Sequence, residues 1–396
     1  MKNRNQSGSA HAVLVVVIIL ALLGALGFVF VRTIGKNNDQ KNMPGGSSIE
    51  ADCKGSSGTV QMKHSPMDLK DISSIMPIGL LAGPHVTPID HLYFYPKDMK
   101  NRDAAPVYAM ADGYITGYSA RTQNVQGGAQ KAEYRLFMQH SCDFYSYFDL
   151  MTSLDSSIAS QMKDGEKLKV PIKAGQVLGR VGAQSLDTAI YNYAMTLPGF
   201  VRPESYVAED WKIHTDDFFK YFDEPLKSQM LALNPRKVEP YGGKIDYDVA
   251  GKLQGNWFLE GTNGYAGPEK YHNGQNPDGK GYWVGHFSIA PDAVNVDLVD
   301  ISFGEYNGQA TQFTALSSSP DPALVGPSDG VVKYELTRYI QPTPNPTGGV
   351  MARDTKVLGT VLLQVLDGGK LKMQAFPGKM ASEVAEFTSA AKTYVR

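Results

Sequence analysis

The chain lacks several features from which common functions are built. It contains only two cysteines among its 396 residues, and its 38 Lys and Arg against 40 Asp and Glu give a formal net charge of −2. This balance provides no basic field for gripping nucleic acid. No G-x-S-x-G nucleophile elbow, Walker phosphate loop or H-E-x-x-H zinc helix occurs. We therefore expect no nucleic-acid partner and none of the enzyme classes that these motifs define.

Charge is absent altogether from residues 12–31, a run of 20 residues. At 1.5 Å per residue, a helix of this length crosses the hydrocarbon core of a bilayer. A cleaved signal peptide is the alternative, but the apolar run is longer than a usual signal core of about 7–15 residues, and no clear small-x-small cleavage site comes after it. We interpret residues 1–11 as a cytoplasmic tail and residues 12–31 as an uncleaved transmembrane signal anchor. The lipid bilayer is thus an expected partner.

The orientation of this single-pass segment is not fixed by its flanking charges. Basic residues lie on both sides of it, so the positive-inside rule does not decide the topology. A polar linker, residues 32–59, contains Cys53, and Cys142 lies further along the chain. Two cysteines cannot complete a structural zinc site, so they are either a disulfide or two separate thiols. We expect the disulfide, with the C-terminal domains outside the cytoplasmic membrane.

The segment 60–204 predicts antiparallel β structure. Short runs rich in Tyr, Val, Ile and Phe nearly alternate with polar residues and are divided by Asp-Gly and Ala-Gly turns. The 40 glycines and 23 prolines of the chain agree with a turn-rich, mainly β protein. We expect a β-sandwich here.

Four pieces of this segment, in order, resemble the lysostaphin-type (LytM-type) zinc peptidoglycan endopeptidases, which share a duplicated hybrid motif. Residues 105–115, "APVYAMADGYI", resemble their "tPVyApadGvV" hairpin. Residues 135–140 and 145–150, "RLFMQH" and "YSYFDL", resemble the strand pair "vvidHg…ytvYaHLs". Residues 170–182, "VPIKAGQVLGRVG", are similar to "VkaGqvIGyvG". The resemblance covers roughly residues 75–195, about a third of the chain, and implies a LytM-like β-sandwich.

The resemblance does not extend to the zinc ligands. The family holds zinc with the His and Asp of H-x-x-x-D and the second His of H-x-H, leaving one position for a reactive water. Here Asp90 matches the aspartate, but Val86 stands four residues before it and His85 is one step out of register. The histidine of Y-a-H-L aligns with Phe148 or Asp149. The strand expected to carry H-x-H, residues 186–193, has no histidine at all.

What survives is a weak remnant, His85, Asp90 and His91, within the stretch 84–94. One interpretation is a rearranged zinc site that uses these three side chains. The other is a polar pair, Asp90 and His91, that braces the hairpin. We favour the second and predict no catalytic residue, no bound metal and no cofactor, with zinc the metal that the remnant would take.

Aromatic side chains could still line the former substrate groove. The candidates are Tyr93, Tyr95, Tyr114, Tyr191 and Tyr193. They are either groove residues that contact a ligand or core and rim residues of the sandwich.

Two further units complete the chain. Residues 205–250 show near-helical spacing of apolar residues and then turn chemistry, which predicts a helical connector and linker. Residues 251–396 predict a second antiparallel β domain, barrel-like, in which Gly255-Asn256-Trp257 resembles the G-x-W that opens lipocalin-like barrels. An amphipathic helix is expected over residues 381–394.

We interpret the whole as a membrane-anchored cell-envelope protein. Its peptidase-like domain would be an inactive module that binds peptidoglycan or an envelope protein, or regulates such a partner. One alternative is an active zinc endopeptidase of cell-wall peptides that uses shifted ligands. Another is a carrier of a small ligand inside the C-terminal barrel.

Overall fold

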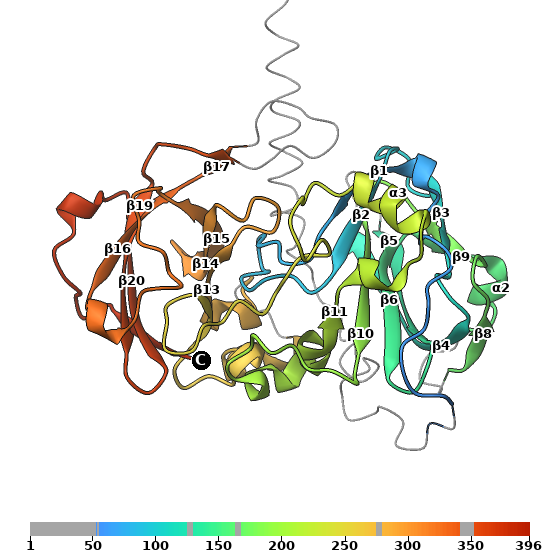
Figure 1. Cartoon of the computed structure of the whole chain (residues 1–396), viewed down its shortest axis with the longest axis horizontal. Helices are drawn as coiled ribbons and strands as arrows, with labels where there is room; N and C mark the ends of the chain where they lie inside the picture. Colours follow the sequence, from blue (N-terminus) through green and yellow to red (C-terminus); the bar gives the residue numbers. More distant parts are fainter. Residues whose placement is uncertain (1–52, 54, 125–129, 163–167, 275–278, 341–351) are drawn as a thin grey trace, which may run out of the picture.

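The structure, a computed structural model, describes residues 53, 55–124, 130–162, 168–274, 279–340 and 352–396. It is mainly β, as the sequence predicts, and it forms two lobes joined by a helical stretch (Figure 1). The expected transmembrane segment 12–31 and nearly all of the linker 32–59 up to Cys53 lie outside the described residues. Across the ranges that are described, no helix is long and apolar enough to span a bilayer.

The first lobe is built on a large antiparallel sheet with the strand order β1-β2-β10-β6-β5-β4-β8, and β11 pairs with β10. Its central strands carry many buried Tyr and Phe residues, which favour extended backbone. The strands of this sheet are β1 (Ile72–Met76), β2 (Leu92–Pro96), β4 (Gly113–Asn124), β5 (Gln130–Gln139), β6 (Phe144–Met151), β8 (Val170–Ile172), β10 (Leu186–Asn192) and β11 (Thr215–Asp216).

A smaller antiparallel sheet covers one face of the large one. Its order is β3-β9-β7, and its strands are β3 (Ala105–Tyr108), β7 (Ser153–Leu154) and β9 (Val177–Val181). Val107, Leu178 and Val181 of this sheet share a core with Phe94 and Phe148 of the large sheet. The two sheets therefore enclose the main hydrophobic core, as expected for a sandwich.

The opposite face of the large sheet is polar and aromatic, and we call it the outer face. Because side chains alternate along a strand, the neighbours of the core residues Phe94 and Phe148 point to the other side. In register, Tyr93 of β2 lies opposite Asp187 of β10, and Asp187 lies opposite Asp149 of β6. A separate aromatic cluster continues this face: Phe137, Tyr145, Tyr147, Tyr191, Tyr193 and Trp211.

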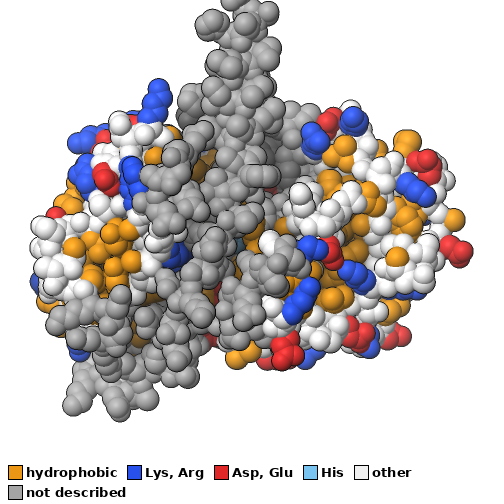
Figure 2. Space-filling model, turned by 180° about the vertical axis from the view of Figure 1, so that it is seen from behind, with side chains coloured by type: hydrophobic (Ala, Val, Ile, Leu, Met, Phe, Trp, Pro, Cys, Tyr) orange, Lys and Arg blue, Asp and Glu red, His pale blue; other side chains and the backbone are white. Residues whose placement is uncertain are grey.

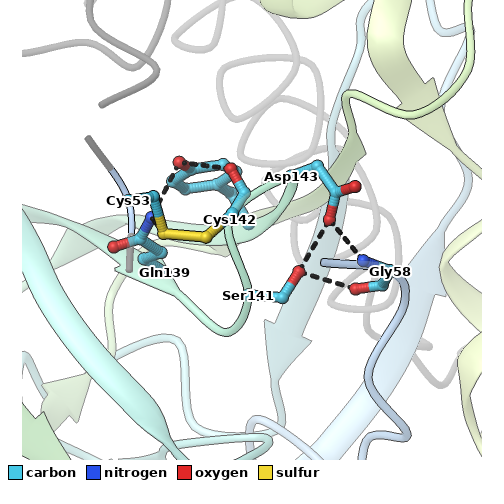
Figure 3. Close-up of a disulfide and its surroundings, with 7 residues drawn as sticks. Cys53, Gly58, Gln139, Ser141, Cys142 and Asp143 are labelled. Carbon is cyan, nitrogen blue, oxygen red and sulfur yellow. Dashed lines mark hydrogen bonds between the residues drawn. A yellow bond between two sulfur atoms is a disulfide. The ribbon is translucent and has the colours of Figure 1, made fainter. Parts of the chain in front are cut away.

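The predicted disulfide between Cys53 and Cys142 is confirmed (Figure 3). It fastens the end of the linker to the turn between β5 and β6, with a Cα–Cα distance of 5.6 Å. Hydrogen bonds support the attachment: the amide of Gly58 donates to Asp143 Oδ1 (2.6 Å), and the hydroxyl of Ser141 donates to the Gly58 carbonyl (2.6 Å). The chain thus enters the first lobe at this turn.

Short helices connect the lobes. They are η3 (Pro203–His214), η4 (Phe218–Tyr221) and α3 (Leu226–Ala232). The first is interrupted at Glu209, whose φ of −139° and ψ of 63° are not helical. Phe218, Phe219 and Phe222 pack into the main core, while Trp211 joins the aromatic cluster of the outer face. The connector therefore contacts both faces of the large sheet.

The second lobe is a closed antiparallel barrel of eight strands, which confirms the barrel expectation. Its interior is filled by apolar side chains, among them Trp257, Phe287, Phe303 and Tyr334. The barrel strands are β12 (Gly255–Leu259), β13 (His286–Pro291), β14 (Val299–Tyr306), β15 (Gln309–Ala315), β16 (Val332–Thr337), β19 (Gly359–Leu366), β20 (Lys370–Pro377) and β21 (Lys392–Val395). A small ladder also forms, β17 (Tyr339–Ile340) with β18 (Ala352–Arg353).

The expected C-terminal helix over residues 381–394 is wrong. That region holds one short turn, η9 (Ala381–Glu383), and then the strand β21. The reason is tertiary: β21 pairs with β20 on one side and β12 on the other, and this removes the two open edges that an unclosed sheet would expose. Barrel closure outweighs the helical spacing of a segment that has few strong apolar residues.

Direct contacts join the two lobes. The side-chain amide of Gln312 on β15 accepts a hydrogen bond from the amide of Gly83 and donates to its carbonyl, both at 2.9 Å. Asn256 of β12 donates to the hydroxyl of Tyr206 on the connector (2.8 Å).

On the face seen from behind, acidic and basic side chains are interspersed where the surface is described, so this part carries no field of a single sign (Figure 2).

Candidate functional site

The three candidate residues His85, Asp90 and His91 lie in the loop between β1 (Ile72–Met76) and β2 (Leu92–Pro96), at the end of the outer face. The loop is held by backbone pairing of Ala82 with His85 and by the Gln312 contact to Gly83. The structure brings the three candidates together: the ring centres of His85 and His91 are 5.7 Å apart, and His91 Nδ1 is 3.4 Å from Asp90 Oδ1. The loop is thus fixed from both lobes.

Asp90 is buried, with 5% of its surface exposed, and three donors hold its carboxylate. The ammonium of Lys212 donates to Oδ1 at 2.8 Å. Trp211 Nε1 and the Tyr191 hydroxyl donate to Oδ2 at 2.9 and 3.2 Å. Both oxygens of the aspartate that matches the family's zinc ligand are therefore engaged by the protein itself.

The electrostatics favour this ion pair. Burial alone would oppose ionisation, but Lys212 and His91 hold the pKa of Asp90 well below its usual value. Burial likewise disfavours the ammonium, yet the carboxylates of Asp90 and Glu209 raise the pKa of Lys212. Lys212 Nζ is 3.7 Å from Glu209 Oε2 and 4.9 Å from the ring centre of Tyr265, which follows the first barrel strand. One cation thus links the loop, the connector and the barrel lobe.

His91 lies between two carboxylates. Its Nε2 is 3.5 Å from Asp187 Oδ2, and Asp187 also accepts a hydrogen bond from Ser185 (3.0 Å). Burial, with a smaller contribution from Asp149, raises the pKa of Asp187 to about 7, although His91 opposes the shift. A carboxyl group that titrates near neutrality therefore adjoins a histidine on the outer face.

Asp149 has the opposite environment, although it is one strand away. Arg121 and Arg135 both form ion pairs with its carboxylate. Despite the opposing effect of burial, these guanidinium groups lower the pKa of Asp149. Arg121 also opposes the rise in the pKa of Asp187, though less than His91 does. The pKa values of these two neighbouring acids are therefore shifted in opposite directions.

A zinc ion does not fit the residues present. Zinc needs three protein ligands with free lone pairs and an open position for water. Both oxygens of Asp90 are taken by donors, and both ring nitrogens of His91 face carboxylates. Among the described residues, no group of three or more His, Cys, Asp or Glu is arranged to hold a metal.

The five candidate tyrosines do not share one pocket. Tyr93 and Tyr95 stand on β2, with ring centres 6.2 Å apart, and both are partly exposed. Tyr191 is 1% exposed and its hydroxyl is bound to Asp90. The ring of Tyr193 lies 5.6 Å from that of Tyr145, and Tyr114 on β4 is 41% exposed. Four strand spacings, roughly 19 Å, separate β2 from β4.

Sequence reasoning missed the residues that decide this site. Lys212 and Trp211 lie in the connector, where the spacing of apolar residues indicated only a helix, and Glu209 precedes them in the same segment. No local motif marks these residues as partners of Asp90. The alignment of Asp149 with a histidine position of the family was the one available signal for the outer-face charges.

Comparisons with known proteins identify no family. No family model matches the chain, and no curated protein matches it. Among solved structures, the crystal structure of a zinc containing peptidase from Vibrio cholerae aligns at a TM-score of 0.23 and 18% identity. The alignment covers 33% of this chain and 36% of the peptidase, so the chain spans about a third of that protein's length. A likeness at this TM-score carries no argument about fold or activity.

Proposed function

We propose that the chain is a membrane-anchored protein of the cell envelope whose first lobe binds peptidoglycan or an envelope partner without cleaving it. The anchor is residues 12–31, and both lobes lie outside the cytoplasmic membrane. The proposal rests on the sequence resemblance to lysostaphin-type peptidases and on one structural observation, the ammonium of Lys212 on Asp90. A hydrolase of that family needs this carboxylate for metal, and here it belongs to an internal ion pair.

The outer face supports a binding role. Tyr93 and Tyr95 present partly exposed rings beside His91 and the acid Asp187, a combination of stacking surfaces and hydrogen-bonding groups suited to a sugar or peptide. The carrier alternative is less well supported, because the interior of the barrel is filled by its own side chains.

The test uses the full chain, purified in detergent without chelator. We expect no release of label from labelled peptidoglycan, and co-sedimentation with insoluble peptidoglycan that weakens when Tyr93 is replaced with Ala. Tyr118→Ala is the matched control, because Tyr118 is also partly buried but packs against the core on the opposite face of the same sheet. Co-sedimentation should be unchanged in this control.

Two results would contradict the proposal. Turnover that disappears in Asp90→Ala, with zinc near one per chain, would establish a rearranged active site. Binding that is equally reduced by Tyr93→Ala and Tyr118→Ala would show that the outer face is not the binding surface.

A further inference from the structure

The contact between Lys212 and Asp90 has the arrangement of a condensation site. The ammonium of Lys212 and the carboxylate of Asp90 meet at 2.8 Å, with side-chain exposures of 5% and 7%. Aromatic side chains surround them: Trp211 and Tyr191 touch Asp90, and Tyr265 lies over Lys212. Such burial excludes water from the ion pair. Water would stabilise the charged groups and would favour hydrolysis of an amide over its formation.

A third carboxyl group is placed to move protons. Glu209 Oε2 is 3.7 Å from Lys212 Nζ, and the side chain is 28% exposed. Burial raises the pKa of Glu209, so its carboxylate is a better proton acceptor than an ordinary glutamate and can return the proton afterwards. The helix η3 is interrupted at Glu209, the same residue whose carboxylate lies close to Lys212.

The second oxygen of Asp90 is held as an oxyanion would be. Trp211 Nε1 and the Tyr191 hydroxyl both donate to Oδ2, while Oδ1 accepts from the amine. Fixed donors on the oxygen where negative charge develops lower the barrier to attack at the carboxyl carbon, and more so in a site without water. The two oxygens are thus differentiated into one that stays and one that can leave.

From this geometry we propose that Lys212 and Asp90 join in an intramolecular isopeptide bond, with Glu209 as the proton shuttle. One proton passes from the ammonium to Oδ1, which leaves a neutral amine beside a carboxylic acid. The nitrogen lone pair then forms the bond to Cγ, and the carbonyl electron pair moves to Oδ2. Glu209 carries a second proton from the nitrogen to Oδ1. The Cγ–Oδ1 bond breaks with its electrons, water leaves, and Oδ2 reforms the carbonyl of an amide.

This inference goes beyond the proposed function and does not depend on it. The test is the mass of the full chain after reduction and denaturation, with a tryptic map of the region. The wild-type chain should be lighter than its sequence by one water, with the peptides that contain Asp90 and Lys212 recovered as one cross-linked species. Lys220, which is paired to Asp216 at 3.2 Å but 58% exposed, serves as an internal control and should stay unlinked.

Matched variants separate the chemistry from the ion pair. Lys212→Arg keeps the positive charge but has no amine nucleophile, and Glu209→Gln keeps the shape but cannot shuttle protons. Both should retain the full sequence mass while folding, as near-ultraviolet circular dichroism would show. Asp90→Asn should reach the same final mass as wild type by losing ammonia. Folded wild-type chain at full sequence mass, with Lys212 cleaved normally by trypsin, would overturn the proposal whatever the variants do.

Discussion

Replacing Asp187 with Asn should stabilise the protein at alkaline pH and change little at pH values below about 4. Burial raises the pKa of Asp187 from 3.8 to about 7. Because the folded state holds this proton more tightly than the unfolded state, stability falls as the pH rises from about 4 through 7. The full difference of about 3 in pKa corresponds to about 4 kcal/mol.

The substitution removes this cost while keeping an oxygen that can accept the hydrogen bond from Ser185. We compare the free energy of unfolding of the variant with that of wild type at each pH. From pH 5 to pH 8, this difference should shift by about 2.5 kcal/mol in favour of the variant. The assay is urea unfolding of both proteins at the two pH values. The pKa of Asp149 is lowered in both proteins, so the effect of Asp149 on the free energy of unfolding cancels when the two are compared. An equal difference between variant and wild type at pH 5 and pH 8 would refute the burial argument.

Three further predictions concern the joints of the molecule. Gln312→Ala removes both hydrogen bonds to Gly83 and should cost about 1–2 kcal/mol, with faster amide hydrogen exchange in the loop 79–91 as the measurement; unchanged exchange there would contradict the clamp. Arg396→Ala removes a guanidinium that lies 4.0 Å from the Trp257 ring centre and donates hydrogen bonds to backbone carbonyls. The free energy of unfolding of the barrel should fall by about 3 kcal/mol, as measured by tryptophan fluorescence in denaturant. Cys142→Ser opens a covalent loop with a sequence separation of 89 and should lower the free energy of unfolding by about 4–5 kcal/mol in urea, a loss that wild type should reproduce under reducing conditions.

The elements that were predictable from the sequence are those with local signals. Alternating apolar residues and turn glycines predicted the strands around residues 105–115 and 170–182, and Gly255-Asn256-Trp257 marks the first strand of a barrel. Because the chain has two cysteines, each thiol had one possible partner within the chain. Each of these signals depends on residues close in sequence or on a choice with one option.

The site could not be predicted in the same way. Lys212 meets Asp90 across a separation of 122 residues, and its own surroundings in sequence look like an ordinary helical connector. Burial, with a smaller contribution from Asp149 on the neighbouring strand, raises the pKa of Asp187 to about 7, and no residue near Asp187 in the sequence indicates this. The helix expected near the C-terminus failed for a related reason, since the need to close the barrel is a property of all eight strands and not of residues 381–394.

The attachment of Cys53 to the turn after β5 also has a mechanical consequence. A pull transmitted along the chain from before Cys53 passes through the sulfur–sulfur bond to Cys142 and bypasses the residues between them. The load therefore enters at the head of β5 and β6, in the middle of the large sheet, where each strand is hydrogen-bonded to neighbours on both sides. Tension from the proposed membrane anchor would reach these interior strands first, and β1 at the sheet edge would carry little of it.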